Sequence, residues 1–264
     1  MVAILSNQRE VILEAVRRMY TDVAMTPMRG FHFPTGRAAC EFVGYPAEQL
    51  DAVPASALES FAGVGYPFAA AVIRRGDTVL DIGAGAGTDA LIASRLVGHE
   101  GRVVGLDMTV AMRDKLRANA AAAAITNVQG LEGNAEEIPL PNGCVDVVTT
   151  NGVINLVPDK PRAIREIARI LASGGRLQFA DIVVESLPSE ACRAKPELWA
   201  ECVVGATTLA LYLDEFAAAG LSDLEIIDRV DYFSASASAE TRKIAASFGA
   251  HSIVLRGRKA PFAV

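Results

Sequence analysis

Short apolar runs and helical patterns alternate along residues 77–184, and this alternation restricts the chain to a small group of folds. Apolar, β-branched runs predict strands at 78–82, 102–106, 128–131, 144–150 and 176–184. Apolar residues at helical spacing predict helices at 89–97, 109–124 and 159–171. Strands joined by helices of this length imply βαβ crossovers, and therefore a parallel sheet whose two faces are both covered.

The last part of the chain changes this rhythm. A helix is predicted at 213–219, before Gly220, and two strands are predicted at 224–232 and 252–258. One of these late strands is expected to insert antiparallel to its neighbours. We therefore predict an α/β, Rossmann-like fold, with a doubly wound and mostly parallel sheet of seven strands and a helical lid at the N-terminus.

The lid is predicted because the N-terminal segment differs from the rest. Residues 8–21 carry apolar side chains at helical spacing, and a second helical stretch is predicted at 47–61. Between them, residues 26–36 contain two prolines, two glycines and two phenylalanines, which is typical of a loop. We interpret residues 1–70 as a lid that covers a substrate and residues 71–264 as the main domain, since lids that exclude water are common in enzymes.

Composition excludes several classes of protein. The net charge of −6 argues against a nucleic-acid partner, which requires clustered basic surface. No segment reaches the ~18 uninterrupted apolar residues of a membrane span, and no secretory signal is visible at the start. Cys40, Cys144, Cys192 and Cys202 lack C-x-x-C spacing, so neither a metal site nor a disulfide framework is indicated. We expect a cytoplasmic protein that acts on a small molecule, of undetermined oligomeric state.

The most informative motif is the loop VLDIGAGAGTD at 79–89, between the first predicted strand and helix. Glycines let the backbone turn tightly and approach a ligand, and the helix N-terminus leaves N–H groups facing the same space. Two ligand classes compete for this loop. The dinucleotide fingerprint G-x-G-x-x-G/A fits in a relaxed form that ends at Ala90. The pattern G-x-G-x-G also fits, with Asp81 as an acid two residues before it.

An acidic residue also ends the second predicted strand. Asp107 follows Gly87 by 20 residues (107 − 87 = 20). At this spacing a carboxylate binds ribose hydroxyls in the dinucleotide-binding folds. Asp107 therefore predicts a ribose-containing ligand without choosing between the two classes.

Further motifs distinguish between the two ligand classes. After the glycine loop and Asp107 come GNAEEIP at 133–139, VDVV at 145–148 and LASGGRL at 171–177. The chain resembles, over residues 70–260, the class I S-adenosylmethionine-dependent methyltransferases, which carry these motifs in this order. The resemblance implies S-adenosylmethionine as the cofactor and methyl transfer as the reaction.

The resemblance also implies which residues bind the cofactor. The glycine loop lines the methionine and ribose portions, Asp107 holds the ribose hydroxyls, and Asn151 lies beside the methionine portion. Met108, Ala135 and Glu136 lie around the adenine. Asn134 stands where the family commonly has an acid, so the chain departs from the family's pattern at this position. The implied cofactor-binding residues are Asp81, Gly83, Ala84, Gly85, Gly87, Asp107, Met108, Asn134, Ala135, Glu136 and Asn151.

One stretch, VVTTNGVINLVPDK at 147–160, resembles the arsenite methyltransferase group in particular, as do the segments GVG and ECVVGA. That group carries a cysteine in each of these three segments. Only Cys202 remains here, because Val64 and Gly152 stand at the other two positions. Trivalent arsenic is soft and prefers thiolate ligands, about three of them. We therefore expect a different small acceptor, such as a thiol, another metalloid or another small nucleophile, with arsenite as the alternative.

The sequence alone does not identify the catalytic residue. A hydroxyl or ammonium acceptor needs a general base, whereas a thiolate or a soft lone pair does not. His32 is a candidate base, Tyr20 a candidate to cover the cofactor, and Cys202 a candidate to contact the substrate. Two other classes of function remain as alternatives, an NAD(P)-dependent oxidoreductase and a non-catalytic cofactor-binding protein.

Overall fold

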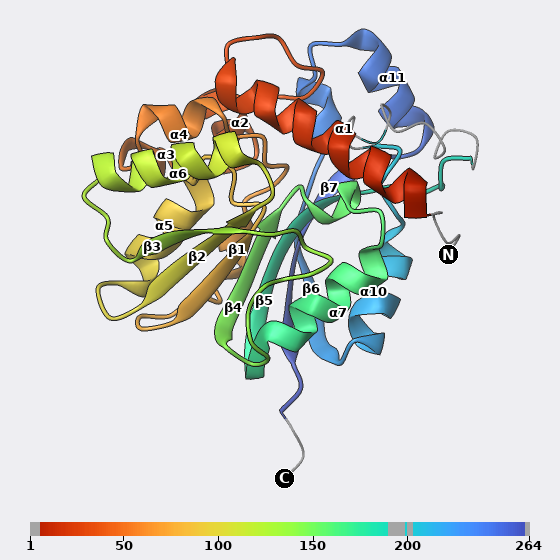
Figure 1. Cartoon of the computed structure of the whole chain (residues 1–264). Coiled ribbons are helices and arrows are strands. Elements are labelled where there is room, and N and C mark those ends of the chain that lie inside the picture. Colours follow the sequence, from red (N-terminus) through yellow and green to blue (C-terminus); the bar gives the residue numbers. More distant parts are fainter. Residues whose placement is uncertain (1–5, 190–198, 200–202, 262–264) are drawn as a thin grey trace.

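A sheet of seven strands forms the centre of the protein, in the order β3-β2-β1-β4-β5-β7-β6 (Figure 1). The computed structural model describes residues 6–189, 199 and 203–261. The strands are β1 Thr78–Ile82, β2 Arg102–Asp107, β3 Val128–Glu132, β4 Val145–Asn151, β5 Leu171–Val183, β6 Leu221–Val230 and β7 His251–Lys259. Strands β1 to β5 pair in parallel, and β7 lies antiparallel between β5 and β6. The predicted doubly wound, mostly parallel sheet is thereby confirmed.

Helices precede the sheet and connect its strands. The α-helices are α1 Ser6–Met25, α2 Gly36–Phe42, α3 Ala47–Asp51, α4 Ala55–Glu59, α5 Thr88–Val97, α6 Val110–Ala122, α7 Lys160–Ile170, α10 Leu209–Ala218 and α11 Ala239–Ser247. Short 3-10 turns are η1 Pro67–Ala70, η2 Ile154–Leu156 and η3 Tyr232–Ala235. In the described part of the chain, no helix combines the length and the apolar character that crossing a bilayer requires.

Local sequence explains how these helices begin and which side they bury. At α7, the Asp159 side chain accepts a hydrogen bond from the backbone N–H of Arg162 at 3.0 Å, which satisfies a free donor of the first turn. Pro161 sits in the same turn, where its missing N–H costs nothing. Ile164 and Ile167 recur at helical spacing and are fully buried against the sheet.

The strands divide their side chains between two buried layers, because successive residues of a strand point to opposite faces. Val79 of β1 belongs to the apolar cluster shared with α5 and α6, and Leu80 belongs to the cluster shared with α7 and α10. Both faces are therefore covered, as the parallel sheet predicted. The loops at the carboxyl ends of the strands are left to form a site.

The N-terminal segment corrects one sequence prediction. The single helix predicted at 47–61 is wrong: two short helices, α3 and α4, replace it, and Pro54 immediately precedes α4. Helix α2 was not predicted. Helix α1 was predicted and extends across the upper edge of the sheet, where it packs on α6 (Figure 1). The division of the chain at residue 70 stays a prediction.

Candidate functional site

A cavity opens at the carboxyl ends of β1, β2 and β4. The strand order reverses between β1 and β4, and open α/β sheets bind their ligands at such a reversal. The glycine loop 83–86 lines one side of the cavity, and Leu13, Val16 and Tyr20 of α1 line another. Helix α1 thus contributes to the wall of the site, and its role as a lid stays a prediction.

The glycine loop is held against the end of β2. The backbone N–H groups of Gly83 and Ala84 both donate to the carbonyl oxygen of Leu106, at 2.8 and 3.0 Å. Gly83 has a φ of +72°, in the region that favours glycine. A Cβ atom at this position would also overlap the side chain of Val153, which lines the cavity. Both the backbone conformation and the available space therefore require glycine at this position.

Asp107 sits at the end of β2 with its carboxylate fixed by the backbone. One oxygen accepts the N–H of Gly85 at 2.9 Å, and the other accepts the N–H of Thr109 at 2.8 Å. Desolvation raises the pKa of Asp107 above its ordinary value, against the opposing effect of these two hydrogen bonds. Asp107 is thus a preorganised acceptor that ties the glycine loop to the cavity wall.

Asp81 is a second acid of the cavity wall, and it is only 2% exposed. Its Oδ2 atom has no hydrogen-bond partner among the described residues. Burial raises the pKa of Asp81 well above its ordinary value, and the nearby carboxylates of Asp89 and Asp107 raise it further. A buried acceptor without a partner is costly, so this end of the cavity is suited to a ligand that brings a donor or a positive charge.

Asn151 ends β4 and connects it to the N-terminal segment. Its Oδ1 atom accepts the N–H groups of Val64 and Gly65 at 2.8 and 3.2 Å. Its Nδ2 atom donates to the Gly65 carbonyl, to the Tyr45 hydroxyl and to Asp89, at 3.0, 3.0 and 3.1 Å. The amide lines the cavity while its hydrogen-bonding groups are engaged within the protein.

Glu136 anchors α1 to the rim of the cavity. The Glu136 side chain is 1% exposed and forms an ion pair with Arg9 of α1. Its other oxygen accepts the N–H of Asp159 at 2.8 Å. Asn134, next to it, accepts the N–H groups of Glu136 and Glu137 at 2.9 and 3.1 Å. These contacts shape the rim of the site and hold the helix that lies across it.

Replacing Arg9 by Met is expected to loosen α1, because the buried Glu136 carboxylate loses its cationic partner. We expect the free energy of local opening of α1 to fall by about 2 kcal/mol. This is less than the usual cost of breaking a fully buried ion pair, because Arg9 is partly exposed. Amide hydrogen exchange of α1 should accelerate at least tenfold. Arg17→Met is the matched control, since Arg17 pairs with Glu14 on the exposed side of the same helix. Equal exchange in both variants would contradict the anchoring role.

The structure brings most of the predicted residues to one cavity. Its lining contains Asp81, Gly83, Ala84, Gly85, Asp107, Met108, Asn134, Ala135, Glu136, Asn151 and, among the catalytic candidates, Tyr20. Gly87 lies just behind them as the residue before α5, with a φ of +100°. The proximity of these residues is observed, whereas their contacts with a cofactor remain a prediction.

Of the other two catalytic candidates, only His32 lies in the described part of the chain. His32 is outside the lining, with its ring 4.7 Å from that of Phe33 in an edge arrangement. Its carbonyl oxygen accepts the hydroxyl of Ser236 at 2.7 Å, which ties this loop to the turn after β6. The structure therefore places His32 outside the lining of the cavity, and a role as a base stays a prediction. Cys202 falls outside the described residues.

Sequence reasoning missed two residues of the site, Asp89 and Tyr45. Asp89 lines the cavity and accepts a hydrogen bond from the Tyr45 hydroxyl. The signal for Asp89 was present as an acid in the first turn of the helix behind the glycine loop. Tyr45 gave no signal, because its partners lie 44 and 106 positions away in the chain.

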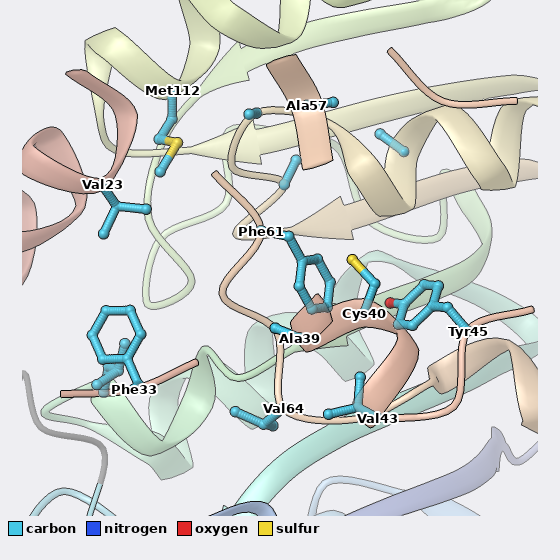
Figure 2. Close-up of a cluster of buried hydrophobic side chains, with 14 of the residues drawn as sticks. Val23, Phe33, Ala39, Cys40, Val43, Tyr45, Ala57, Phe61, Val64 and Met112 are labelled. Atoms are coloured by element: carbon cyan, nitrogen blue, oxygen red, sulfur yellow. The ribbon is translucent and has the colours of Figure 1, made fainter. Parts of the chain in front are cut away.

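The two positions where the resemblance expects cysteines, Val64 and Gly152, are adjacent in space. A Cβ atom at Gly152 would lie 3.0 Å from Cγ1 of Val64. Figure 2 shows Val64 among buried apolar side chains, with Cys40, Phe61 and Tyr45 next to one another nearby. Burial raises the pKa of the Cys40 thiol above its ordinary value, so Cys40 stays protonated at neutral pH.

Comparison with known proteins identifies relatives of the chain. The family described as "Methyltransferase domain" matches residues 73–237. An arsenite methyltransferase of Halobacterium salinarum is 36% identical over 195 residues, which cover 73% of this chain and 49% of that protein. A ubiquinone/menaquinone biosynthesis C-methyltransferase of Vibrio parahaemolyticus is 40% identical over 121 residues, which cover 43% of this chain and 46% of that protein.

The solved structures agree with these relatives. An arsenic (III) S-adenosylmethionine methyltransferase from Chlamydomonas reinhardtii superposes with a TM-score of 0.64 at 28% identity, covering 88% of this chain and 76% of that chain. The chain spans about half the length of the curated relatives it matches, 49% and 46% for the two above. These two relatives therefore contain further sequence beyond the part that matches this chain.

Proposed function

This chain belongs to the methyltransferase-domain family, as a class I S-adenosylmethionine-dependent methyltransferase that resembles the arsenite methyltransferases, and we propose that it methylates a small, soft acceptor of the thiol class. The observation that carries the proposal is one cavity whose lining combines two kinds of group. Glycines and carboxylates occur in it together with apolar side chains such as Leu13, Phe61 and Leu156. The glycines and carboxylates suit the cofactor, and the apolar side chains suit the body of a small acceptor.

The residues present fit S-adenosylmethionine. The glycine loop leaves a space that a Cβ at Gly83 would fill, so the backbone is open to close approach. Asp107 is a fixed acceptor of the kind that ribose hydroxyls require, and Asp81 has a buried oxygen without a partner in the described chain. The nicotinamide alternative loses its support, because the chain matches the methyltransferase family.

The cofactor, when bound, supplies a methyl group already activated on a sulfonium sulfur. The protein is left with binding, orientation and the exclusion of water. Leu13, Val16 and Tyr20 of α1 cover the cavity from above, and Glu136 holds that helix in place through Arg9. This arrangement supports a closed site in which an acceptor is held dry and aligned.

The acceptor side of the cavity is built from apolar side chains. Phe61, Leu156 and Val157 line it together with the apolar residues of α1, whereas Val153 lies against Gly83 of the glycine loop. Such a wall binds the apolar body of a small molecule and offers it no basic group. A thiol meets this requirement, because part of it ionises in water near neutral pH and its soft sulfur needs no general base.

The thiol class is favoured over arsenite by the residues at the positions where the resemblance expects cysteines. Val64 and Gly152 pack against each other where an arsenic site would need sulfur, and neither side chain carries a ligand atom. Cys40 lies outside the lining of the cavity and is fully buried. Arsenite remains the alternative acceptor, with Cys202 as the thiol position that the resemblance retains.

A direct assay tests the proposal. The protein is incubated with methyl-labelled S-adenosylmethionine and a panel of apolar thiols, arsenite and phenols, and products are identified by mass spectrometry. We expect methylation of at least one thiol, at a rate at least tenfold above that of arsenite. Arsenite turnover equal to or above the thiol rate would overturn the acceptor class. Cofactor binding with no product from any acceptor would favour a non-catalytic binder.

A further inference from the structure

Three polar side chains from distant parts of the sequence meet at the edge of the cavity. Tyr45, between α2 and α3, donates its hydroxyl proton to Oδ1 of Asp89 in the first turn of α5. Asn151 donates to Oδ2 of Asp89 at 3.1 Å and to the Tyr45 oxygen at 3.0 Å. Each oxygen of the Asp89 carboxylate therefore has one donor that fixes its orientation.

Asn151 acts in this group as an anchor. Its oxygen accepts two backbone N–H groups of the segment 64–65, and its two amide protons are shared among three acceptors. An amide has two donors and two acceptor lone pairs, so this capacity is filled within the protein. Of the two cavity-lining residues in the group, Asp89 is the one with lone pairs left for a ligand.

The electrostatic surroundings of Asp89 favour a cation. Asp89 is 7% exposed and lines the same cavity as Asp81, whose Oδ2 atom is buried without a partner in the described chain. The titratable groups that face Asp89 are Asp81 on β1, Cys40 on α2, and Tyr45 and Tyr66 on the segments around it. None of these four groups is a cation, and the raised pKa values of Cys40, Tyr45 and Tyr66 keep these three uncharged at neutral pH. The negative charge that attracts a cationic ligand group therefore comes from the ionised carboxylate of Asp89, and from Asp81 when it is ionised.

We propose that Asp89 binds the cationic end of the ligand, the ammonium group of the methionine portion of S-adenosylmethionine, and that Tyr45 is the positioning residue that holds the Asp89 carboxylate in place. This inference rests on the proposed function, because it takes the cofactor of that function as the ligand. It extends the site to a tyrosine of the N-terminal segment, whose ring packs edge-on against Phe61 at 5.3 Å near the core shown in Figure 2.

The titration of Asp89 gives the proposal a measurable signature. Burial raises the pKa of Asp89 to about 6, and the hydrogen bonds from Tyr45 and Asn151 oppose that rise. The ionised carboxylate attracts an ammonium group and the protonated carboxyl does not, so ligand affinity should fall as the pH drops through about 6. Removing the Tyr45 hydroxyl removes a hydrogen-bond donor to the ionised Asp89 carboxylate. The pKa of Asp89 then rises, and the loss of ligand affinity moves to higher pH.

The experiment is a calorimetric titration of the full chain with S-adenosylhomocysteine between pH 5 and pH 8. For Tyr45→Phe we expect the midpoint of the affinity loss to move up by about one pH unit relative to the wild type. Tyr66→Phe is the matched control, since Tyr66 lies 4.8 Å from the Tyr45 ring and its hydroxyl bonds Gln49. Its midpoint should equal that of the wild type. Thermal unfolding of both variants is measured in parallel.

A second variant keeps the test decisive if Tyr45→Phe folds poorly. Asp89→Asn preserves shape and removes the charge, and we expect affinity at pH 7.5 to fall by about tenfold or more, with a flatter pH profile. A lower melting temperature of Tyr45→Phe with an unmoved midpoint would overturn the positioning role. Wild-type affinity in Asp89→Asn would overturn the cation site. Failure of the wild type itself to bind would instead overturn the proposed function, and this inference with it.

Discussion

Asp107→Ala is expected to lower the affinity for S-adenosylhomocysteine by at least about 100-fold, equivalent to about 2.7 kcal/mol. Two hydrogen bonds to a charged acceptor contribute about 1.5–3 kcal/mol each, and the ribose of the ligand offers two hydroxyls. The substitution also frees the N–H of Gly85, which Asp107 accepts at 2.9 Å, so the glycine loop loses a fixed point. Isothermal titration calorimetry measures the change directly.

The control for this prediction is Asp114→Ala on α6. Asp114 is an exposed carboxylate that pairs with Arg117 on the surface, and its loss should leave the affinity within twofold of the wild type. If Asp107→Ala binds as tightly as the wild type, Asp107 does not hold the sugar and the cofactor assignment of the whole loop is wrong.

The strands of the sheet could be predicted because turn residues and glycines in the local sequence mark where several of them begin and end. Strand β1 was predicted at 78–82 and is observed at Thr78–Ile82, since a turn precedes it and Gly83 ends it. The late strand pair was predicted too, with the antiparallel member now identified as β7. Strand β5 begins five residues earlier than predicted, because Leu171 pairs with Val145 across a register irregularity that no local pattern indicates.

The N-terminal segment was harder to predict, since its elements are short. Helix α2 spans only seven residues and begins at Gly36, a poor helix former, so no periodicity marks it. Pro54 breaks the stretch predicted as one helix, as prolines do. In such segments tertiary packing decides the structure, here through the buried side chains of Cys40, Leu50 and Leu58.

For the site, the sequence motifs predicted the residues at the strand ends, but they did not predict contacts between side chains that are distant in the sequence. The glycine loop and Asp107 follow from spacing alone, because both stand at the end of a strand. The contact of Tyr45 with Asp89 joins a loop before α3 to the start of α5, and a single sequence contains no sign of it. His32 shows the converse, since a residue type able to act as a base lies outside the lining of the cavity, with its ring against Phe33.

Gly83→Ala is expected to lower the free energy of unfolding by about 3 kcal/mol and to weaken S-adenosylhomocysteine binding at least tenfold. The left-handed backbone at φ +72° costs a residue with a Cβ about 1–2 kcal/mol. The new methyl group overlaps Val153, a β-branched side chain with little rotamer freedom, and overpacking of this kind costs a further 1–3 kcal/mol. Urea unfolding and calorimetry measure the two effects.

Gly76→Ala separates the two causes. Gly76 has a φ of +84°, and nothing lies within 4 Å of a Cβ built there, so only the backbone term applies. For Gly76→Ala we expect the free energy of unfolding to fall by about 1 kcal/mol and the ligand affinity to stay unchanged. If both variants lose the same stability, the overlap with Val153 is relieved at no cost. If Gly83→Ala then also binds normally, close approach of the backbone at Gly83 is not what the ligand requires, and recognition lies with the carboxylates of Asp81, Asp89 and Asp107.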